Sequence, residues 1–208
     1  MEDLALVGSW VGTIALAIAL AASAGLRAWL PLFVAGLLAK LGVADVGDGF
    51  GWLASWPALV LFGVATVLEI VGDKVPALDH ALDTVGTVLR PIAGAVAAAA
   101  VLVNIHDPMM AMVLGMVVGA PVALAPHAVK AGTRAVSSAT TAGLANPVIS
   151  TIEDVIAISI ALLAFVVPVL VALVVLFAGF LMWRWISRRR WAQRAPEPSG
   201  PVDGQARA

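Results

Sequence analysis

The chain alternates long apolar blocks with short polar regions. The apolar blocks occupy residues 4–24, 28–43, 52–71, 92–105, 109–125 and 155–186. A helix needs roughly 20 apolar residues to cross the hydrocarbon core of a bilayer, and the first block has that length. The blocks are too long and too uniform to be the inner faces of soluble amphipathic elements. The pattern therefore predicts an all-α integral membrane helical bundle of about six spans.

Three stretches depart from the simple pattern of one span per block. Residues 28–43 are short enough to form a partial or re-entrant span, whereas residues 155–186 would measure roughly 48 Å as one helix and must tilt, bend at Pro168 or leave the bilayer. Residues 74–90 have helical spacing and predict a short amphipathic helix that ends before Pro91. We expect residues 127–152 to form a second amphipathic or re-entrant segment, and the Ala-rich block 92–105 to lie inside the bundle.

Composition supports a membrane location and excludes several classes of protein. Apolar residues make up 62% of the chain, charged residues 12%, and the mean hydropathy is +1.02, all outside the range of soluble domains. The net charge of −1 gives no reason to expect a nucleic-acid partner. The absence of cysteine excludes disulfides, thiolate metal sites and thiol nucleophiles. We expect one transmembrane domain over residues 1–194 and a disordered polar tail over residues 195–208.

The polar regions also predict a topology. With six crossings, the connections at 25–27, 72–91 and 126–154 fall on one side of the membrane, and the turns at 45–48 and 106–107 fall on the other. Arg188, Arg189 and Arg190 follow the last block. They predict a multi-pass protein of the bacterial inner membrane, the cell membrane, with a cytoplasmic C-terminus and with anionic lipid headgroups as partners. The basic residues of the polar regions then lie outside, which means either that they are buried functional groups that do not report topology or that the span count is off by one.

Charged residues close to the hydrocarbon are the candidate functional groups. Each costs about 2.5–3.5 kcal/mol at the centre of a span, so each needs a physical reason. Glu69 and Asp73 share a helical face, as do His127, Lys130 and Arg134. The predicted substrate or proton cavity consists of Glu69, Asp73, Lys74, Asp79, His80, Asp83, Arg90, His127, Lys130, Arg134, Glu153 and Asp154.

Two interpretations of these charges are open. They are either interfacial caps, ion pairs and snorkelling side chains that stabilise the bundle, or they line a shared hydrated cavity. In the second case acids and bases neutralise one another until a charged substrate or a proton competes for one partner.

A metal site is a sharper variant of the cavity hypothesis. Its candidate ligands are Glu69, Asp73, His80 and His127. No HxxxH, HxH or ExxH pattern occurs within one helix, so these ligands would have to converge from separate segments. The sequence requires no cofactor. It also contains no GxSxG, HExxH, P-loop or GxGxxG motif, and we assign no catalytic residue.

Several motifs in one order resemble a bacterial membrane protein family described only as a domain of unknown function. They are E-x3-D-K-V-P-x2-D-H from Glu69, R-P-x-A-G-A from Arg90, H-x2-K-x3-R from His127 and N-P-x2-S-x2-E-D from Asn146, preceded by Gly25-Leu-Arg-Ala-Trp-Leu-Pro. The resemblance covers roughly residues 20–170. It implies a multi-span helical membrane protein and adds no activity.

The leading functional hypothesis is a transporter or channel-like protein. Its substrate would be a small polar or charged solute or a lipid headgroup, moving through the charged cavity. The second hypothesis is an intramembrane enzyme that acts on a lipid substrate, and the transporter is favoured over it. The third is a structural or accessory membrane protein whose charges only lock the bundle. A homo-oligomer is compatible with all three.

Overall fold

The computed structural model describes residues 2–192, apart from the side chains of residues 2–6, 76, 77, 79, 80, 186 and 189–192. The regular elements of these residues are all helical, which confirms the all-α fold. They are α1 (Glu2–Leu26), α2 (Leu30–Lys40), a short 3₁₀ helix (Gly51–Ala54), α3 (Trp56–Gly72), α4 (Pro76–Ala100), α5 (Pro108–Leu114), a π-helical segment (Gly115–Gly119), α6 (Ala120–Thr141), α7 (Asn146–Val166) and α8 (Pro168–Ala192).

Within the described residues 2–192, five helical runs are long and apolar enough to cross a membrane. They are Val7–Leu26, Ala81–Ala100, Pro108–Thr141, Asn146–Val166 and Pro168–Trp185. The helices α2 and α3 are apolar but shorter. The protein is therefore a multi-pass integral membrane protein, with five long candidate spans and two shorter apolar helices where the sequence pattern predicts about six spans.

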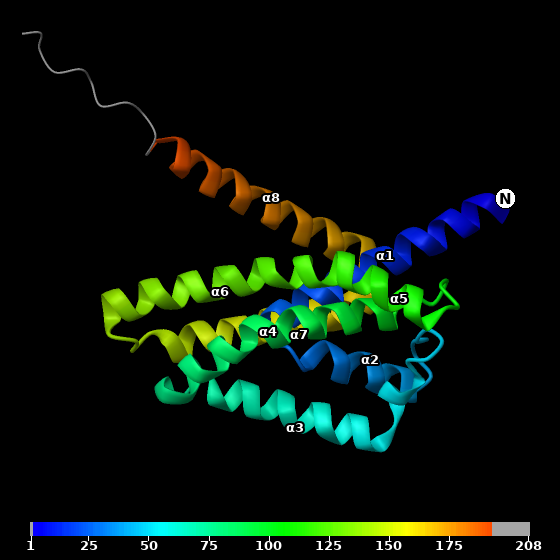
Figure 1. The fold of residues 1–208 in the computed structure, drawn as a ribbon, viewed down its shortest axis with the longest axis horizontal. Helices are drawn as coiled ribbons and strands as arrows, with labels where there is room; N and C mark the ends of the chain where they lie inside the picture. The colour runs from blue at the N-terminus through cyan, green and yellow to red at the C-terminus, as the bar shows by residue number, and fades with distance from the viewer. Residues whose placement is uncertain (1, 193–208) are drawn as a thin grey trace, which may run out of the picture. The chain divides into compact units, whose positions relative to one another are not determined.

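The chain divides into two compact units, Met1–Val175 and Leu176–Ala208. Within the first unit, α1 packs against α4, α6 and α7. The helices α6 and α3 lie on opposite sides of the layer that holds α4 and α7 (Figure 1). The described part of the second unit is the remainder of α8, and residues 195–208, which we expect to be a disordered tail, lie outside the described residues.

Small residues allow the central helices to approach closely. A Cβ atom added at Gly25 would clash with the carbonyl oxygen of Ala123, and one added at Gly119 would clash with the carbonyl oxygen of Gly94. The alanines at 97–100 are fully buried. Because lipid tails are as apolar as leucine, membrane helices associate through such close backbone packing. The predicted place of residues 92–105 inside the bundle is confirmed.

Prolines and polar caps set several helix boundaries. Asp107 accepts hydrogen bonds from the backbone N–H groups of Met109 (2.8 Å) and Met110 (3.2 Å) and so caps α5. The helix α7 ends at Val166 and α8 begins at Pro168, so the apolar run 155–186 breaks at that proline. Proline cannot donate the backbone hydrogen bond that would continue α7.

The prediction that a helix ends before Pro91 is wrong. The helix α4 runs through Pro91 to Ala100, because its Ala-rich second half is held against α1 and α6 by the close packing described above. Residues 127–152 do not form a separate segment either. Their first part continues the long run Pro108–Thr141, and the chain turns only at Ala142 and Gly143, which both have positive φ.

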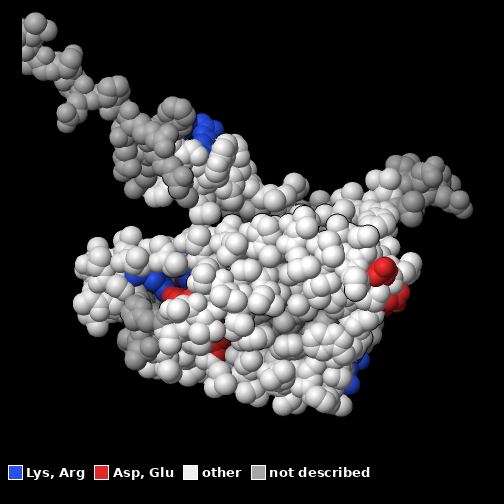
Figure 2. Space-filling model, viewed as in Figure 1, with Lys and Arg blue, Asp and Glu red and all other residues white. Residues whose placement is uncertain are grey.

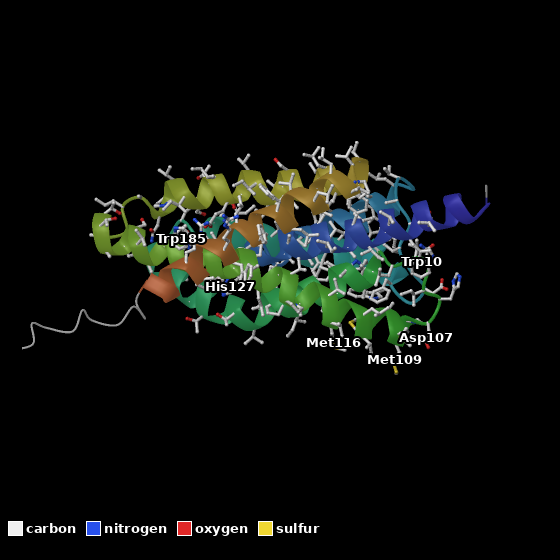
Figure 3. The ribbon with its side chains drawn as sticks, turned by 90° about the horizontal axis from the view of Figure 1, so that it is seen from above. Trp10, Asp107, Met109, Met116, His127 and Trp185 are labelled. Atoms are coloured by element: carbon white, nitrogen blue, oxygen red, sulfur yellow. The ribbon has the colours of Figure 1, made fainter. Side chains whose placement is uncertain are left out.

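The turns at 45–48 and 106–107, which the sequence pattern places on the same side of the membrane, lie next to each other in the structure. Asp48 Oδ2 lies 3.1 Å from His106 Nδ1, which joins the two connections expected on one side. Figure 3 shows Asp107 and Met109 at this end and His127 well away from them, toward the other end. The connections 25–27 and 72–76 are joined there by the ion pair between Arg27 and Asp73.

Candidate functional site: a buried charge network

Arg27 is the most deeply buried member of the charge network. It lies in the connection between α1 and α2 and is fully buried. Its Nε donates to Oδ1 of Asp154 at 2.6 Å, and its terminal nitrogens donate to Oδ2 of Asp73 and to Oγ of Ser150 at 3.0 Å. One guanidinium thus joins three helical segments, which matches its planar fork of five donors.

Asp73 caps the C-terminal end of α3 and collects three cations on a single oxygen. Its Oδ2 accepts from Arg27, from Lys130 Nζ at 2.5 Å and from Arg134 at 3.0 Å. Its Oδ1 has no hydrogen-bond partner among the described residues, although the residue is only 1% exposed. The helical spacing that places Lys130 and Arg134 on one face of α6 brings both to this carboxylate.

A second arm of the network is built on Arg90 of α4. Arg90 lies 3.6 Å from Glu69 Oε1 and 3.4 Å from Asp83 Oδ1, and one of its terminal nitrogens donates to His127 Nδ1. Because a guanidinium only donates, the Nδ1 of His127 accepts and its Nε2 carries the proton toward Thr87 Oγ1, 3.2 Å away. The geometry therefore fixes a neutral imidazole.

Glu153 and Asp154 of α7 complete the network. Glu153 Oε2 accepts from Arg134 at 3.2 Å, and Asp154 Oδ2 accepts from Lys74 at 2.7 Å. The described members thus include five cations and five carboxylates in mutual contact: Arg27, Lys74, Arg90, Lys130, Arg134, Glu69, Asp73, Asp83, Glu153 and Asp154.

The electrostatics of the network favour ionised groups despite burial. Asp73 lies in the connection between α3 and α4, outside the candidate spans. Burial by itself would raise the pKa of this carboxyl, but Arg27 and Lys130 hold its pKa below the ordinary value. An ionised Asp73 is therefore part of the resting network.

Charged atoms are scarce on the face of the molecule shown in Figure 2. Blue and red atoms appear at the end where α6 lies over α4 and α7, and others lie at the opposite end near α5. An apolar cavity of about 730 Å³ beside α4 is lined by Trp29, Phe62 and Met112 and by none of the ten charged members. The network itself is closely packed in this structure.

Most of the sequence-predicted site residues meet in this network. The structure brings together Glu69, Asp73, Lys74, Asp83, Arg90, His127, Lys130, Arg134, Glu153 and Asp154. The side chains of Asp79 and His80 lie outside the described residues, as do those of Arg189 and Arg190, while Arg188 is exposed.

The metal candidates do not form a ligand set among the described side chains. No group of three or more His, Asp or Glu residues in the described part of the chain is arranged to hold a metal ion. Glu69 and His127 both face the Arg90 guanidinium, and Asp73 faces three cations. These carboxylates and the imidazole are engaged by protein cations.

Sequence analysis missed Arg27 and Ser150 as site residues. Both belong to motifs of the family resemblance, and Arg27 is a charge between two apolar blocks. That position is typical of an exposed connection, whereas Asp73, Ser150 and Asp154 enclose the Arg27 guanidinium. Its place in the motif Gly25-Leu-Arg-Ala-Trp-Leu-Pro is the signal that could have identified Arg27.

A family model described as a domain of unknown function (DUF4126) matches residues 14–188. The chain belongs to this family. The matched range contains every member of the charge network, and the resemblance noted in the sequence is confirmed at the level of the family. No curated protein and no solved structure matches the chain.

Proposed function

We propose that the protein is a transporter or channel-like protein that moves a small polar or charged solute, or a lipid headgroup, by rearranging the buried charge network. The single observation that carries this proposal is the contact of Asp73 Oδ2 with Arg27, Lys130 and Arg134. One carboxylate oxygen couples the α1–α2 connection, the α3–α4 connection and α6. Any charged solute that competes for these cations changes how those segments are held.

Stability alone is a weak reason for such a network. Replacing a buried ion pair by apolar residues of similar volume is often neutral or stabilising, because removing two charges from water costs about as much as their attraction returns. Ionisable groups inside membrane bundles usually mark a substrate, ion or proton pathway. The Lys130 ammonium lies within ion-pair distance of three carboxylates, those of Asp73, Asp83 and Glu153. Such an arrangement allows Lys130 to exchange one partner for another.

We also propose a location and a lipid contact. The arginines at 188–190 follow the last span and favour a cytoplasmic C-terminus in the cell membrane, with anionic headgroups near them. Because α7 and α8 are separate candidate spans, a cytoplasmic C-terminus places the start of α7, and with it the network, on the cytoplasmic side, which supports access to the network from the cytoplasm.

The test is flux through the full-length protein in sealed liposomes. Currents on a solid-supported membrane would be recorded for a panel of protons, inorganic cations, inorganic anions and small organic acids. We expect the wild type to respond to at least one member, and Asp73→Asn and Lys130→Gln to lose most of that response.

The matched control is Asp48→Asn, because Asp48 is exposed and pairs with His106 at the opposite end. It removes the same charge and should keep the wild-type flux. Equal flux in Asp73→Asn and the wild type, or a wild type that responds to no member of the panel, would contradict the transport proposal.

A further inference from the structure

The three cations on Asp73 form an arrangement that suits an anion with several oxygens. Arg27 and Arg134 each present planar N–H donors, and Lys130 adds a compact ammonium. Their donors converge on one oxygen of Asp73, whereas bidentate guanidinium groups pair best with two oxygens at once. Arg27 also donates to Asp154 and Ser150, and Arg134 also donates to Glu153, so both guanidinium groups are held in place around this oxygen by neighbouring acceptors.

The second oxygen of Asp73 adds an independent requirement. Asp73 Oδ1 is buried and has no hydrogen-bond partner among the described residues. An ionised carboxylate oxygen only accepts, and leaving a buried acceptor unsatisfied costs about 1–3 kcal/mol. A ligand that relieves this cost must bring a donor. Glu69 Oε2, also buried, has the same need.

Few small ligands supply negative oxygens and an O–H donor from one group. A phosphate group that still carries a proton does, because its ionised oxygens accept from cations while its P–OH donates. Sulfate does not, because it carries no proton near neutral pH. The chemistry of the site therefore distinguishes two anions of nearly equal size and shape.

We propose that Arg27, Lys130 and Arg134 bind a protonated phosphate group, either inorganic phosphate or the headgroup of a phosphate monoester lipid, whose P–OH donates to Asp73. Asp73 is then an internal anion that occupies the three cations in the state described here. On binding, the cations turn to the phosphate oxygens and the carboxylate accepts from the P–OH. This inference rests on the proposed transport function only in naming what the protein would carry. Phosphate binding at this site can be measured whether or not the protein transports anything.

The test is equilibrium binding to the purified full-length protein in detergent. Radiolabelled phosphate and sulfate would be measured by equilibrium dialysis at about pH 6, where phosphate groups keep a proton. We expect phosphate to bind at least about tenfold more tightly than sulfate, the difference that one hydrogen bond to a charged group makes.

Asp73→Asn should change the selectivity between phosphate and sulfate and not simply abolish anion binding. The amide donates to a sulfate oxygen and removes the repelling charge, so the preference for phosphate over sulfate should fall by about tenfold. The matched control is Asp48→Asn, which removes an exposed carboxylate outside the charge network and should keep the wild-type preference.

Competition by dihexanoyl phosphatidic acid separates the two sources of phosphate. Displacement of labelled phosphate by this soluble lipid supports a headgroup site, and binding of inorganic phosphate without displacement supports a free-anion site. The inference is overturned by no binding of phosphate, by equal binding of sulfate, or by an unchanged preference in Asp73→Asn. If that variant does not fold, the wild-type preference alone decides.

The two proposals fail in different ways. Phosphate binding without flux of any solute would retain this inference and remove the transport function. Flux of other solutes without phosphate binding would do the opposite.

Discussion

Arg27 Nε donates to Asp154 Oδ1 at 2.6 Å and so joins the C-terminal end of α1 to α7, across 127 positions of the sequence. Both side chains are buried, and the same guanidinium also contacts Asp73. Together with the hydrogen bond from Ser23 Oγ to the Ala157 carbonyl, this contact ties α1 to α7. Removal of Arg27 leaves carboxylates without their nearest cation inside the bundle.

Arg27→Met should lower the free energy of unfolding by about 3–5 kcal/mol, because it breaks two buried ion pairs and takes from Asp73 and Asp154 their nearest cation. Thermal or denaturant unfolding in detergent would measure the change. The control is Lys40→Met, which removes an exposed cation stacked on Trp56 and should cost less than about 1 kcal/mol. Equal stability of the two variants would contradict the bridging role of Arg27.

Lys130→Met and Asp73→Asn should be strongly non-additive. The Lys130 ammonium lies 2.5 Å from Asp73 Oδ2, so each single change leaves a buried charge that the double change removes. The double variant should be at least about 1 kcal/mol more stable than the sum of the single losses predicts. Unfolding of all four proteins gives this coupling, and Lys130→Met combined with Asp48→Asn should be additive within about 0.5 kcal/mol.

Gly119→Ala should destabilise the bundle by about 1–3 kcal/mol, because its Cβ would meet the Gly94 carbonyl on α4. Gly132→Ala on α6 is the matched change. No atom lies within 4 Å of its added Cβ, so the substitution should be neutral or stabilise the helix by up to about 1 kcal/mol. A melting temperature for Gly119→Ala at or above that of Gly132→Ala would show that α4 and the π-helical segment do not pack this closely.

Acid should destabilise the protein in part through Asp73. Its folded-state pKa lies below the ordinary value of 3.8, so its contribution to stability is present above that value and is lost as the pH falls through the folded-state pKa. Melting temperatures measured from about pH 6 down to about pH 3 should fall more steeply for the wild type than for Asp73→Asn. Parallel curves would show that Asp73 is not held ionised by its cations.

Much of the site follows from the sequence because charge near hydrocarbon is costly wherever it occurs. Glu69, Asp73, Lys130 and Arg134 stand out by that criterion, and helical spacing places the last two on one face. Arg27 does not stand out in the same way, because a single cation between two apolar blocks has the pattern of an exposed connection. Only the tertiary contacts with Asp73 at the end of α3 and with Ser150 and Asp154 of α7 enclose it.

The sequence by itself determines that the chain is a helical membrane protein, where its main breaks fall and which polar regions share a side. Hydropathy, block length and the break at Pro168 are local properties, and they do not depend on which helix packs beside which. The partners within the charge network are decided by tertiary structure alone. Three cations meet one oxygen of Asp73 only because small residues let α1, α4 and α6 approach closely, and no periodicity along one segment encodes that convergence. The continuation of α4 through Pro91 has the same origin, since packing against neighbouring helices outweighs the local preference of proline.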